Sequence, residues 1–289
     1  MRFIAESDVR IPKRRKDSHK GDNGLVLAVG GSNYFPGAVA LAGLAALRSG
    51  ADLVNVIAPE KVAWAINAYS PDLVTIKLKT GYFKSRHFSS IKKLMEKYDV
   101  LLIGNGLGLN KDTKKFCIST IRNIKKLKVI DADAIKAISI EDAENSIITP
   151  HAKELEHFLV NSKVNKFIIK KINNQKNIIR KSALIKKITQ KFLERNNVIL
   201  LKGKIDAIIS KDEIFFNKTG NAGMTKGGTG DVLAGLCAGF LAQSKDLLQS
   251  AINAAYFNGL IGDILLKKKK GFTYLASDMV EEIQRIRKL

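Results

Sequence analysis

Short apolar runs alternate with helical stretches along most of this 289-residue chain. The runs are rich in Val, Ile and Leu and end in Gly, Asp or Pro, a pattern typical of buried strands. Strands that alternate with helices of about ten residues or more predict a mostly parallel central sheet covered by helices on both faces. No break in composition and no long linker divides the chain, so we expect one α/β domain over residues 1–289.

The expected strands are Leu25–Val29, Leu53–Ala58, Leu73–Leu78, Asp99–Ile103, Lys128–Asp131, Ser146–Thr149 and Asn197–Leu201, with a hairpin of Ile205–Ser210 and Glu213–Asn217. The expected helices are Ala38–Arg48, Glu60–Tyr69, one through Phe116 and Ile124, one beginning at His151, Asp246–Leu266 and Leu275–Leu289. The first of these is built from small residues, which allows very close packing against a sheet or a ligand.

The formal charge of +22 raises the possibility of nucleic-acid binding, but its distribution argues against it. Residues 161–195 contain eleven Lys and Arg residues and one acid, Glu194, and Lys267–Lys270 forms a second cluster. Aromatic residues do not alternate with these lysines, as stacking platforms for single strands would require. We therefore expect a solvated basic face that helps to attract anionic ligands, and no nucleic-acid partner.

Other features of the sequence indicate a cytoplasmic protein. The chain has no run of eighteen apolar residues, which predicts that it does not span a membrane. Residues 1–20 are mixed and charged and lack the apolar centre of a signal peptide. The two cysteines, Cys117 and Cys237, lie in apolar helical surroundings, where buried reduced thiols are expected.

Polar clusters follow the expected strands at their carboxyl ends. In proteins with a parallel sheet, ligands bind beyond the carboxyl ends of the strands, so we expect these clusters to meet at one site. Their convergence is stronger evidence for a site than any one cluster. The clusters are Gly30–Ser32, Gly104–Gly108, Asp131–Asp133, Pro150–Glu154 and Lys202–Gly203.

The segment Asn221–Gly235 is a glycine-rich loop that leads into an apolar helical run. Glycines allow successive N–H groups to point inward, and the first turn of a helix adds unpaired N–H groups and a positive dipole end. This junction predicts an anion site, suited to a phosphate. Asp231 lies at its mouth, either as an N-cap alone or as a base that takes a proton from an attacking hydroxyl.

Taken together, these motifs resemble those of the ribokinase-like superfamily, and within it the ADP/ATP-dependent NAD(P)H-hydrate dehydratase family. The resemblance covers Lys20 to about Asp263. The matching motifs are KGDNG (20–24), GGS (30–32), FPGA (35–38), ALRSGADLV (46–54), GNGLG (104–108), DADA (131–134), TPHxxE (149–154), LKG (201–203) and NxGMxxGGTGDVLAG (221–235).

The resemblance implies a carbon–oxygen lyase that repairs damaged nicotinamide cofactors. In this family the C6 hydroxyl of the S-epimer of hydrated NADH or NADPH is phosphorylated. Elimination then restores the cofactor and, from ADP, releases AMP and phosphate. The implied cofactor is Mg²⁺, and ADP is the expected phosphoryl donor, with ATP as an alternative. The implied partners are a separate epimerase, since we expect no N-terminal epimerase domain in the chain, and further copies of the chain in a tetramer.

The resemblance also assigns roles to individual residues. Asp231 would accept the hydroxyl proton, and the main-chain N–H groups of Gly228, Thr229 and Gly230 would stabilise the transferred phosphoryl group. The remaining assignments are Lys202, Gly203, Lys204, Ile205, Asp206 and Gly230 for the nucleotide, Ala38, Gly106, His151 and Asp231 for the hydrated nicotinamide, and Glu154 for water-mediated Mg²⁺.

Several assignments have alternatives. His151 could instead cap its helix or lie on the surface, and Glu154 could be a first-turn acid favoured by the helix dipole. Asp206 stands where family members often carry threonine. Asn105 stands where relatives often have proline, and we expect this change to alter only the stiffness of the loop. Residues 161–196 are expected to form an elongated loop-helix excursion with no assigned role.

Two other functions use the same motifs. A ribokinase-like kinase for the hydroxymethyl group of a vitamin precursor, of the thiazole or pyrimidine/pyridoxine type, would need the same base and the same anion site. The FPGA motif and His151 favour the dehydratase. A catalytically silent nucleotide-binding or RNA-associated protein is the third hypothesis, based on the charge alone.

Overall fold

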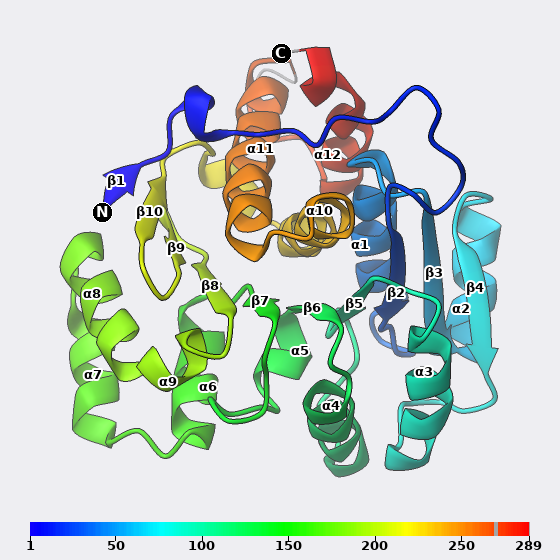
Figure 1. Ribbon diagram of the computed structural model, residues 1–289, viewed down its shortest axis with the longest axis horizontal. Helices are drawn as coiled ribbons and strands as arrows, with labels where there is room; N and C mark the ends of the chain where they lie inside the picture. The colour runs from blue at the N-terminus through cyan, green and yellow to red at the C-terminus, as the bar shows by residue number, and fades with distance from the viewer. Residues whose placement is uncertain (269–270, 289) are drawn as a thin grey trace.

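The protein, described here by a computed structural model of residues 1–268 and 271–288, is built around one ten-stranded sheet (Figure 1). The strand order is β1-β10-β9-β8-β7-β6-β5-β2-β3-β4. Neighbouring strands are parallel except at β9, which is antiparallel to both β8 and β10. The strands are β1 (Arg2–Phe3), β2 (Leu25–Val29), β3 (Leu53–Pro59), β4 (Val74–Leu78), β5 (Val100–Ile103), β6 (Leu127–Ile130), β7 (Ser146–Ile148), β8 (Asn197–Leu201), β9 (Asp206–Ile209) and β10 (Ile214–Asn217).

Helices cover both faces of the sheet, as the alternating pattern predicted (Figure 1). One face carries α1 (Pro36–Arg48), α2 (Glu60–Tyr69), α10 (Thr229–Ser244), α11 (Leu247–Lys268) and α12 (Ala276–Glu282). The other carries α3 (Phe88–Met95), α4 (Lys111–Asn123), α5 (Ala132–Ile135), α6 (Ala152–Asn161), α7 (Lys166–Asn174), α8 (Ile178–Ile188) and α9 (Gln190–Leu193). Short 3₁₀ turns lie at η1 (Glu6–Asp8), η2 (Ser85–His87), η3 (Ala222–Thr225) and η4 (Ile283–Lys288).

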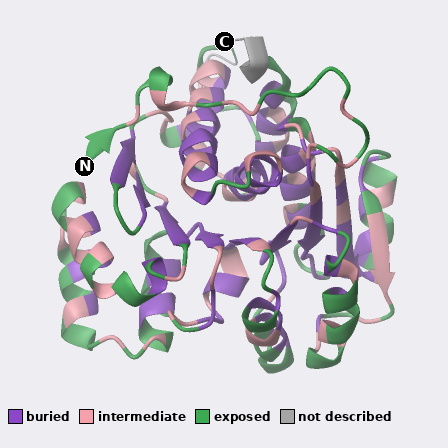
Figure 2. Cartoon of the chain, viewed as in Figure 1, coloured by how far each residue is buried: buried purple, intermediate pink, exposed green. Residues whose placement is uncertain are grey.

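The strands separate two hydrophobic clusters. In β2, Val26 and Ala28 contact the cluster under α1 and α10, whereas Leu27 and Val29 contact the cluster under the opposite helices. Figure 2 shows the central strands buried and the outer helix surfaces exposed. Because both faces of the sheet are covered, the strands read as continuous apolar runs and not as an apolar–polar alternation.

Helices α1 and α10 pack unusually closely. A Cβ atom at Gly235 of α10 would overlap the carbonyl oxygen of Ala42 in α1, and one at Gly239 would lie 2.5 Å from the carbonyl oxygen of Ala46. The small residues of α1 therefore serve contact with another helix. Since α10 begins with the glycine-rich segment, this contact fixes the position of the predicted anion site.

Most predicted elements are confirmed, with differences at the ends. The hairpin is formed by β9 and β10, with Ile209 paired to Ile214. The basic segment contains three helices, α7 to α9, and β1 was not predicted. The last helix was predicted to continue to the end of the chain, but α12 ends at Glu282 and η4 follows it. Lys269 and Lys270 of the second basic cluster, and Leu289, lie outside the described residues.

No helix in the part of the chain that the structure describes is long and apolar enough to cross a membrane. Within the same residues, both cysteines are buried free thiols, as predicted.

Candidate active site

Four adjacent parallel strands, β5 to β8, end at the same edge of the sheet and bring the polar clusters together. Asn105 follows β5, Asp131 follows β6, Thr149 follows β7 and Lys202 follows β8. The carboxylate of Asp131 lies at the centre of this group. Its Oδ1 accepts hydrogen bonds from Thr149 Oγ1 (2.6 Å) and Lys202 Nζ (3.0 Å), and its Oδ2 accepts one from Asn105 Nδ2 (2.9 Å).

Helix α10 begins directly above this edge. Its N-cap is Gly228, in the left-handed region at φ 94°, and its first residue is Thr229. Asp231 is the third helical residue, so the reading of Asp231 as the N-cap is wrong: glycine adopts the left-handed turn more easily and takes that place. The first intrahelical bond runs from the Val232 N–H to the Gly228 carbonyl, which leaves the preceding N–H groups available for an anion.

The side chain of Asp231 points to the same polar group. Its Oδ1 accepts a hydrogen bond from Asn105 Nδ2 at 2.7 Å. Burial, and secondarily the nearby charge of Asp131, raise the pKa of Asp231 to about 7, although the hydrogen bond from Asn105 acts in the opposite direction. A carboxyl group with a pKa near neutrality is suited to accept a proton from a hydroxyl.

Lys202 joins the carboxylates of Asp131 and Glu154. Its Nζ lies 3.0 Å from Asp131 Oδ1 and 3.6 Å from Glu154 Oε2. Burial lowers the pKa of Lys202, but the two carboxylates outweigh burial and hold the pKa above its usual value. A Cβ atom at Gly230 would lie 3.4 Å from the same Nζ, so this ammonium group lies directly beside the first turn of α10. The predicted anion site therefore has a fixed positive charge at its floor.

His151 and Glu154 form the start of α6. The His151 Nδ1 accepts hydrogen bonds from the Lys153 and Glu154 N–H groups, and Glu154 Oε2 accepts one from the His151 N–H. Burial lowers the pKa of His151, and the neutral ring can then accept these bonds. The structure thus shows the capping interpretation for His151 and places Glu154 in the first turn of the helix, as its alternative has it. The other ring nitrogen, Nε2, lies 3.3 Å from Glu154 Oε1, and the His151 side chain is 48% exposed.

The predicted nucleotide residues lie together after β8. Gly203 and Lys204 are exposed, whereas Asp206 is partly buried and accepts a hydrogen bond from the Gly203 N–H at 3.0 Å. Asn217 Nδ2 donates to the other oxygen of Asp206 at 3.1 Å. Burial raises the pKa of Asp206 to about 6. Asp206 therefore holds the loop after β8 in shape.

Ala38 and Gly106, predicted to touch the nicotinamide, lie against one another. A Cβ atom at Gly106 would lie 3.1 Å from Ala38 Cβ and 2.7 Å from the Phe35 carbonyl oxygen. Gly106 also has φ +71°, in the left-handed region. The neighbouring Tyr34 and Phe35 residues are 88% and 57% exposed, so this loop carries two largely exposed aromatic rings.

Sequence reasoning missed three members of this group as individual site residues: Asn105, Asp131 and Thr149. Asp131 and Thr149 each begin a matched motif and directly follow a strand, and this position in the sequence could have identified them as site residues. For Asn105 no signal existed beyond its place in a glycine cluster. The expectation that it alters only loop stiffness is incomplete, because its side chain joins two carboxylates.

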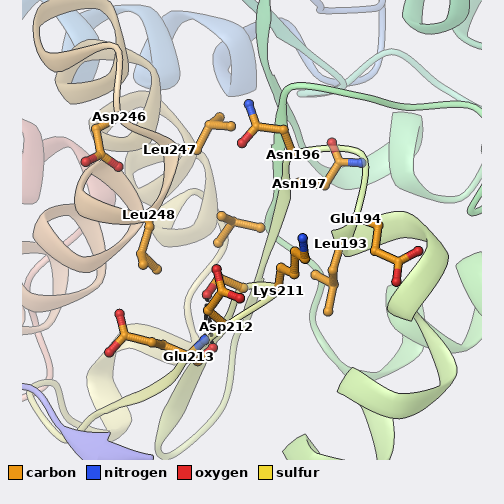
Figure 3. A pocket seen from close by; sticks show the side chains of 12 residues that line it. Leu193, Glu194, Asn196, Asn197, Lys211, Asp212, Glu213, Asp246, Leu247 and Leu248 are labelled. Atoms are coloured by element: carbon orange, nitrogen blue, oxygen red, sulfur yellow. Dashed lines mark hydrogen bonds between the residues drawn. The ribbon is translucent and has the colours of Figure 1, made fainter.

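A separate hollow of about 370 Å³ lies at the opposite end of β8 (Figure 3). The start of β8 at Asn197, the turn at Lys211 and Asp212, and the start of α11 line it. It contains none of the predicted site residues. Asp231, Lys202 and the first turn of α10 lie together instead at the carboxyl ends of the strands, away from this hollow.

A family model described as NAD(P)H-hydrate dehydratase matches residues 26–285. The chain is 40% identical over 282 residues to the bifunctional NAD(P)H-hydrate repair enzyme of Methanocaldococcus jannaschii, covering 96% of this chain and 51% of that protein. The chain thus spans about half the length of such curated relatives. It is 34% identical over 295 residues to the ADP-dependent (S)-NAD(P)H-hydrate dehydratase of Cenarchaeum symbiosum, covering 99% and 97%.

Solved structures are also similar to the chain. A ribokinase-like superfamily protein from Enterococcus faecalis has a TM-score of 0.82 and 28% identity, over 99% of this chain and 95% of that one. The ADP/ATP-dependent NAD(P)H-hydrate dehydratase of Bacillus subtilis, co-crystallised with ATP/Mg²⁺, has a TM-score of 0.80 and 26% identity, over 99% and 97%. The predicted ribokinase-like architecture is confirmed.

Proposed function

Because this chain belongs to the NAD(P)H-hydrate dehydratase family, we propose that it uses ADP to dehydrate the S-epimer of hydrated NADH and NADPH. The products are the reduced cofactor, AMP and phosphate. The observation that carries the proposal is the place of Asp231, whose carboxylate lies beside the free N–H groups at the start of α10. A phosphate and a hydroxyl that is to be phosphorylated can meet there.

The chemistry needs a better leaving group than hydroxide. The oxygen of the C6 hydroxyl attacks the terminal phosphorus of ADP, and the bond from that phosphorus to the AMP oxygen breaks. Asp231 takes the hydroxyl proton, for which its pKa of about 7 suits it. The N–H groups at Gly228, Thr229 and Gly230 stabilise the charge on the transferred group. Phosphate then leaves from C6 with its electron pair, the neighbouring carbon loses a proton, and the ring regains its double bond.

The remaining predicted residues have supporting roles in this proposal. Lys202, beside Gly230, contributes a positive charge to the phosphates. Gly203, Lys204, Ile205 and Asp206 form the loop against the nucleotide. Ala38, Gly106 and His151 form the wall against the hydrated nicotinamide ring.

Mg²⁺ would reach this site together with the nucleotide. Within residues 1–268 and 271–288, no group of three His, Cys, Asp or Glu side chains is arranged to hold a metal ion. Mg²⁺ is commonly held by substrate phosphates, its own waters and one or two carboxylates, and the buried Glu154 fits that limited role. When bound, the ion would neutralise phosphate charge.

The direct test is an assay with hydrated NADH, Mg²⁺ and either ADP or ATP. Recovery of dihydronicotinamide absorbance with ADP supports the proposal, and a comparison of the two nucleotides gives the donor preference. Phosphorylation of thiazole or pyridoxine alcohols without that recovery would instead indicate a kinase. Asp231→Asn should still bind ADP but lose about 10²–10⁴-fold in turnover. Near-normal turnover of this variant would contradict the role of Asp231.

We further propose that copies of the chain assemble into a tetramer and that a separate epimerase supplies the S-epimer. Both proposals are supported by the resemblance to the family. Light scattering at several protein concentrations tests the first. For the second, the assay is run with the R-epimer alone, which should react only after an epimerase is added.

A further inference from the structure

Asn105 lies between the carboxylates of Asp131 and Asp231. It is fully buried in the loop after β5. Its side-chain Nδ2 donates to Asp231 Oδ1 at 2.7 Å and to Asp131 Oδ2 at 2.9 Å. An amide nitrogen has two hydrogens, so each carboxylate receives one. The side-chain Oδ1 is buried and has no hydrogen-bond partner among the described residues.

The surrounding backbone holds Asn105 in this place. The main-chain oxygen of Asn105 accepts a hydrogen bond from the Gly31 N–H at 2.8 Å. Gly104 before it and Gly106 after it both have φ in the left-handed region, at +132° and +71°. A Cβ atom at Gly104 would overlap the Asp131 carbonyl oxygen, so the loops after β5 and β6 are in direct contact. This loop can therefore present a side chain between Asp131 and Asp231 with little freedom.

The two carboxylates differ in their other partners. Asp131 also accepts hydrogen bonds from Thr149 and Lys202, which keep it in place without Asn105. Among the described residues, Asn105 supplies the side-chain hydrogen bond that the Asp231 carboxylate accepts. The other charged groups that act on Asp231 are Asp131, Lys202 and Glu154. Loss of Asn105 would thus release Asp231 and leave it facing the negative charge of Asp131.

We infer that Asn105 is a positioning residue of the reaction: its amide fixes Oδ1 of Asp231 and leaves Oδ2 to take the proton of the substrate hydroxyl. This inference rests on the proposed function, because it acts through the proposed proton acceptor. In support, the hydrogen bond from Asn105 lowers the pKa of Asp231, against the larger effect of burial. Asn105 therefore also favours the ionised form that can accept a proton.

The kinetic test compares Asn105→Ala with the unmodified chain across pH. We expect turnover to fall about 10- to 100-fold at pH 7, with partial recovery at pH 9 and little change in the KM for ADP, because the unsupported Asp231 ionises at higher pH. In the Asp231→Asn background the same change should cost less than about threefold, since the group through which Asn105 acts is gone. A loss that is equal at every pH, or equal in both backgrounds, would overturn the inference.

A second measurement does not depend on activity and separates this inference from the proposed function. Asn105→Ala should lower the thermal midpoint more at pH 9, where Asp231 is ionised, than at pH 5, and this pH dependence should vanish with Asp231→Asn. If no dehydratase activity is found but this pattern appears, the proposed function fails and the Asn105–Asp231 coupling stands. A midpoint shift that does not vary with pH would contradict the coupling itself.

Matched variants complete the design. Asn110 of the same loop caps α4 by accepting a hydrogen bond from the Thr113 N–H. Asn110→Ala should therefore lower the midpoint equally at both pH values and leave the pH profile of turnover unchanged. If Asn105→Ala does not fold, Asn105→Ser supplies one hydroxyl donor, and its pH profile is expected to lie between those of Asn105→Ala and the unmodified chain. A serine variant with the unmodified profile and full turnover at all pH values would count against the inference.

Discussion

The Lys202 ammonium group lies 3.0 Å from Asp131 Oδ1, and this buried pair lies directly beside the first turn of α10. The Asp131 side chain is 2% exposed and that of Lys202 is 19% exposed. The pair therefore combines two tasks. Lys202 satisfies a buried carboxylate, and in the proposed function it also places a positive charge beside the phosphates of the nucleotide.

Removal of this positive charge should affect both tasks. Lys202→Met leaves Asp131 and Glu154 without a compensating cation, and the loss of one partner of a buried pair typically costs about 3–5 kcal/mol. We expect a decrease of that order in the free energy of unfolding in urea, together with weaker ADP binding by calorimetry. Lys211→Met, at an exposed lysine beside the hollow at the other end of β8, should change neither. Unchanged ADP affinity in Lys202→Met would refute its contact with the phosphates.

The activity should depend on pH through Asp231. In the proposed reaction the proton acceptor must be ionised, and the pKa of Asp231 is raised to about 7. The value of kcat/KM should therefore fall about tenfold for each pH unit below about 7 and level off above it. A profile measured from pH 5 to 9 at saturating Mg²⁺ checks this. A plateau that extends down to pH 5 would show that the acceptor titrates lower or is another group.

The ionised Asp231 carboxylate should lower the free energy of unfolding above about pH 7. Its pKa rises from 3.8 to about 7 on folding, so the folded protein binds this proton more tightly than the unfolded chain does. The resulting stabilisation is complete below pH 3.8 and is lost as pH rises through about 7; its ceiling is roughly 4 kcal/mol. Asp231→Asn should therefore be more stable than the unmodified chain at pH 8, and the difference should shrink toward pH 5. Denaturant unfolding at both pH values measures this, and a constant difference would contradict it.

Two glycines of one loop provide a matched pair of variants that tests the proposed contact with the hydrated nicotinamide. Gly106 and Gly108 both have positive φ, but an added Cβ would meet Phe35 and Ala38 only at Gly106 and nothing within 4 Å at Gly108. Both alanine variants carry the same kind of backbone strain, of order 1 kcal/mol or more. Gly106→Ala alone should raise the KM for the hydrate about tenfold by displacing the loop of residues 33–37. Equal KM values for the two variants would mean that this wall does not touch the substrate.

The contact between α1 and α10 should tolerate no added methyl group. Gly235→Ala would force a Cβ into the Ala42 carbonyl oxygen, and overpacking of this kind costs about 1–3 kcal/mol. Gly37→Ala, at the start of α1 where a Cβ meets nothing within 4 Å, should leave stability equal or slightly higher. Thermal unfolding of both variants at pH 7 gives the comparison. An unchanged midpoint for Gly235→Ala would show that the two helices can separate freely.

The fold was largely predictable because its strands are buried on both faces. Leu25–Val29 and Asn197–Leu201 read as continuous apolar runs, and their bounds agree with β2 and β8. The β1 strand could not be predicted, because two residues at an edge have no periodicity to detect. The end of the last α-helix at Glu282 was also missed, since Asp278 to Arg287 keeps a helix-compatible composition throughout.

The site was predictable only to the level of motifs. Polar residues after parallel strands gave its position, and the glycine-rich segment gave α10. An N-cap role for Asp231 was one of two alternatives, because acidic residues are good caps, whereas the structure uses the left-handed Gly228. The two hydrogen bonds of Asn105 join it to a residue 26 positions away, in the loop after β6, and to one 126 positions away, in α10. No local pattern reports such a contact.

The position of Asp231 within α10, instead of before it, has a consequence for how this scaffold can diversify. The proposed proton acceptor and the proposed N–H donors belong to one helix, so their backbone positions are fixed relative to each other. The aromatic rings of Tyr34 and Phe35 sit on a different segment, ahead of α1. Replacement of that segment could therefore redirect the scaffold to another alcohol while the phosphorylating machinery stays intact, which makes residues 33–37 the rational target for engineering new substrates.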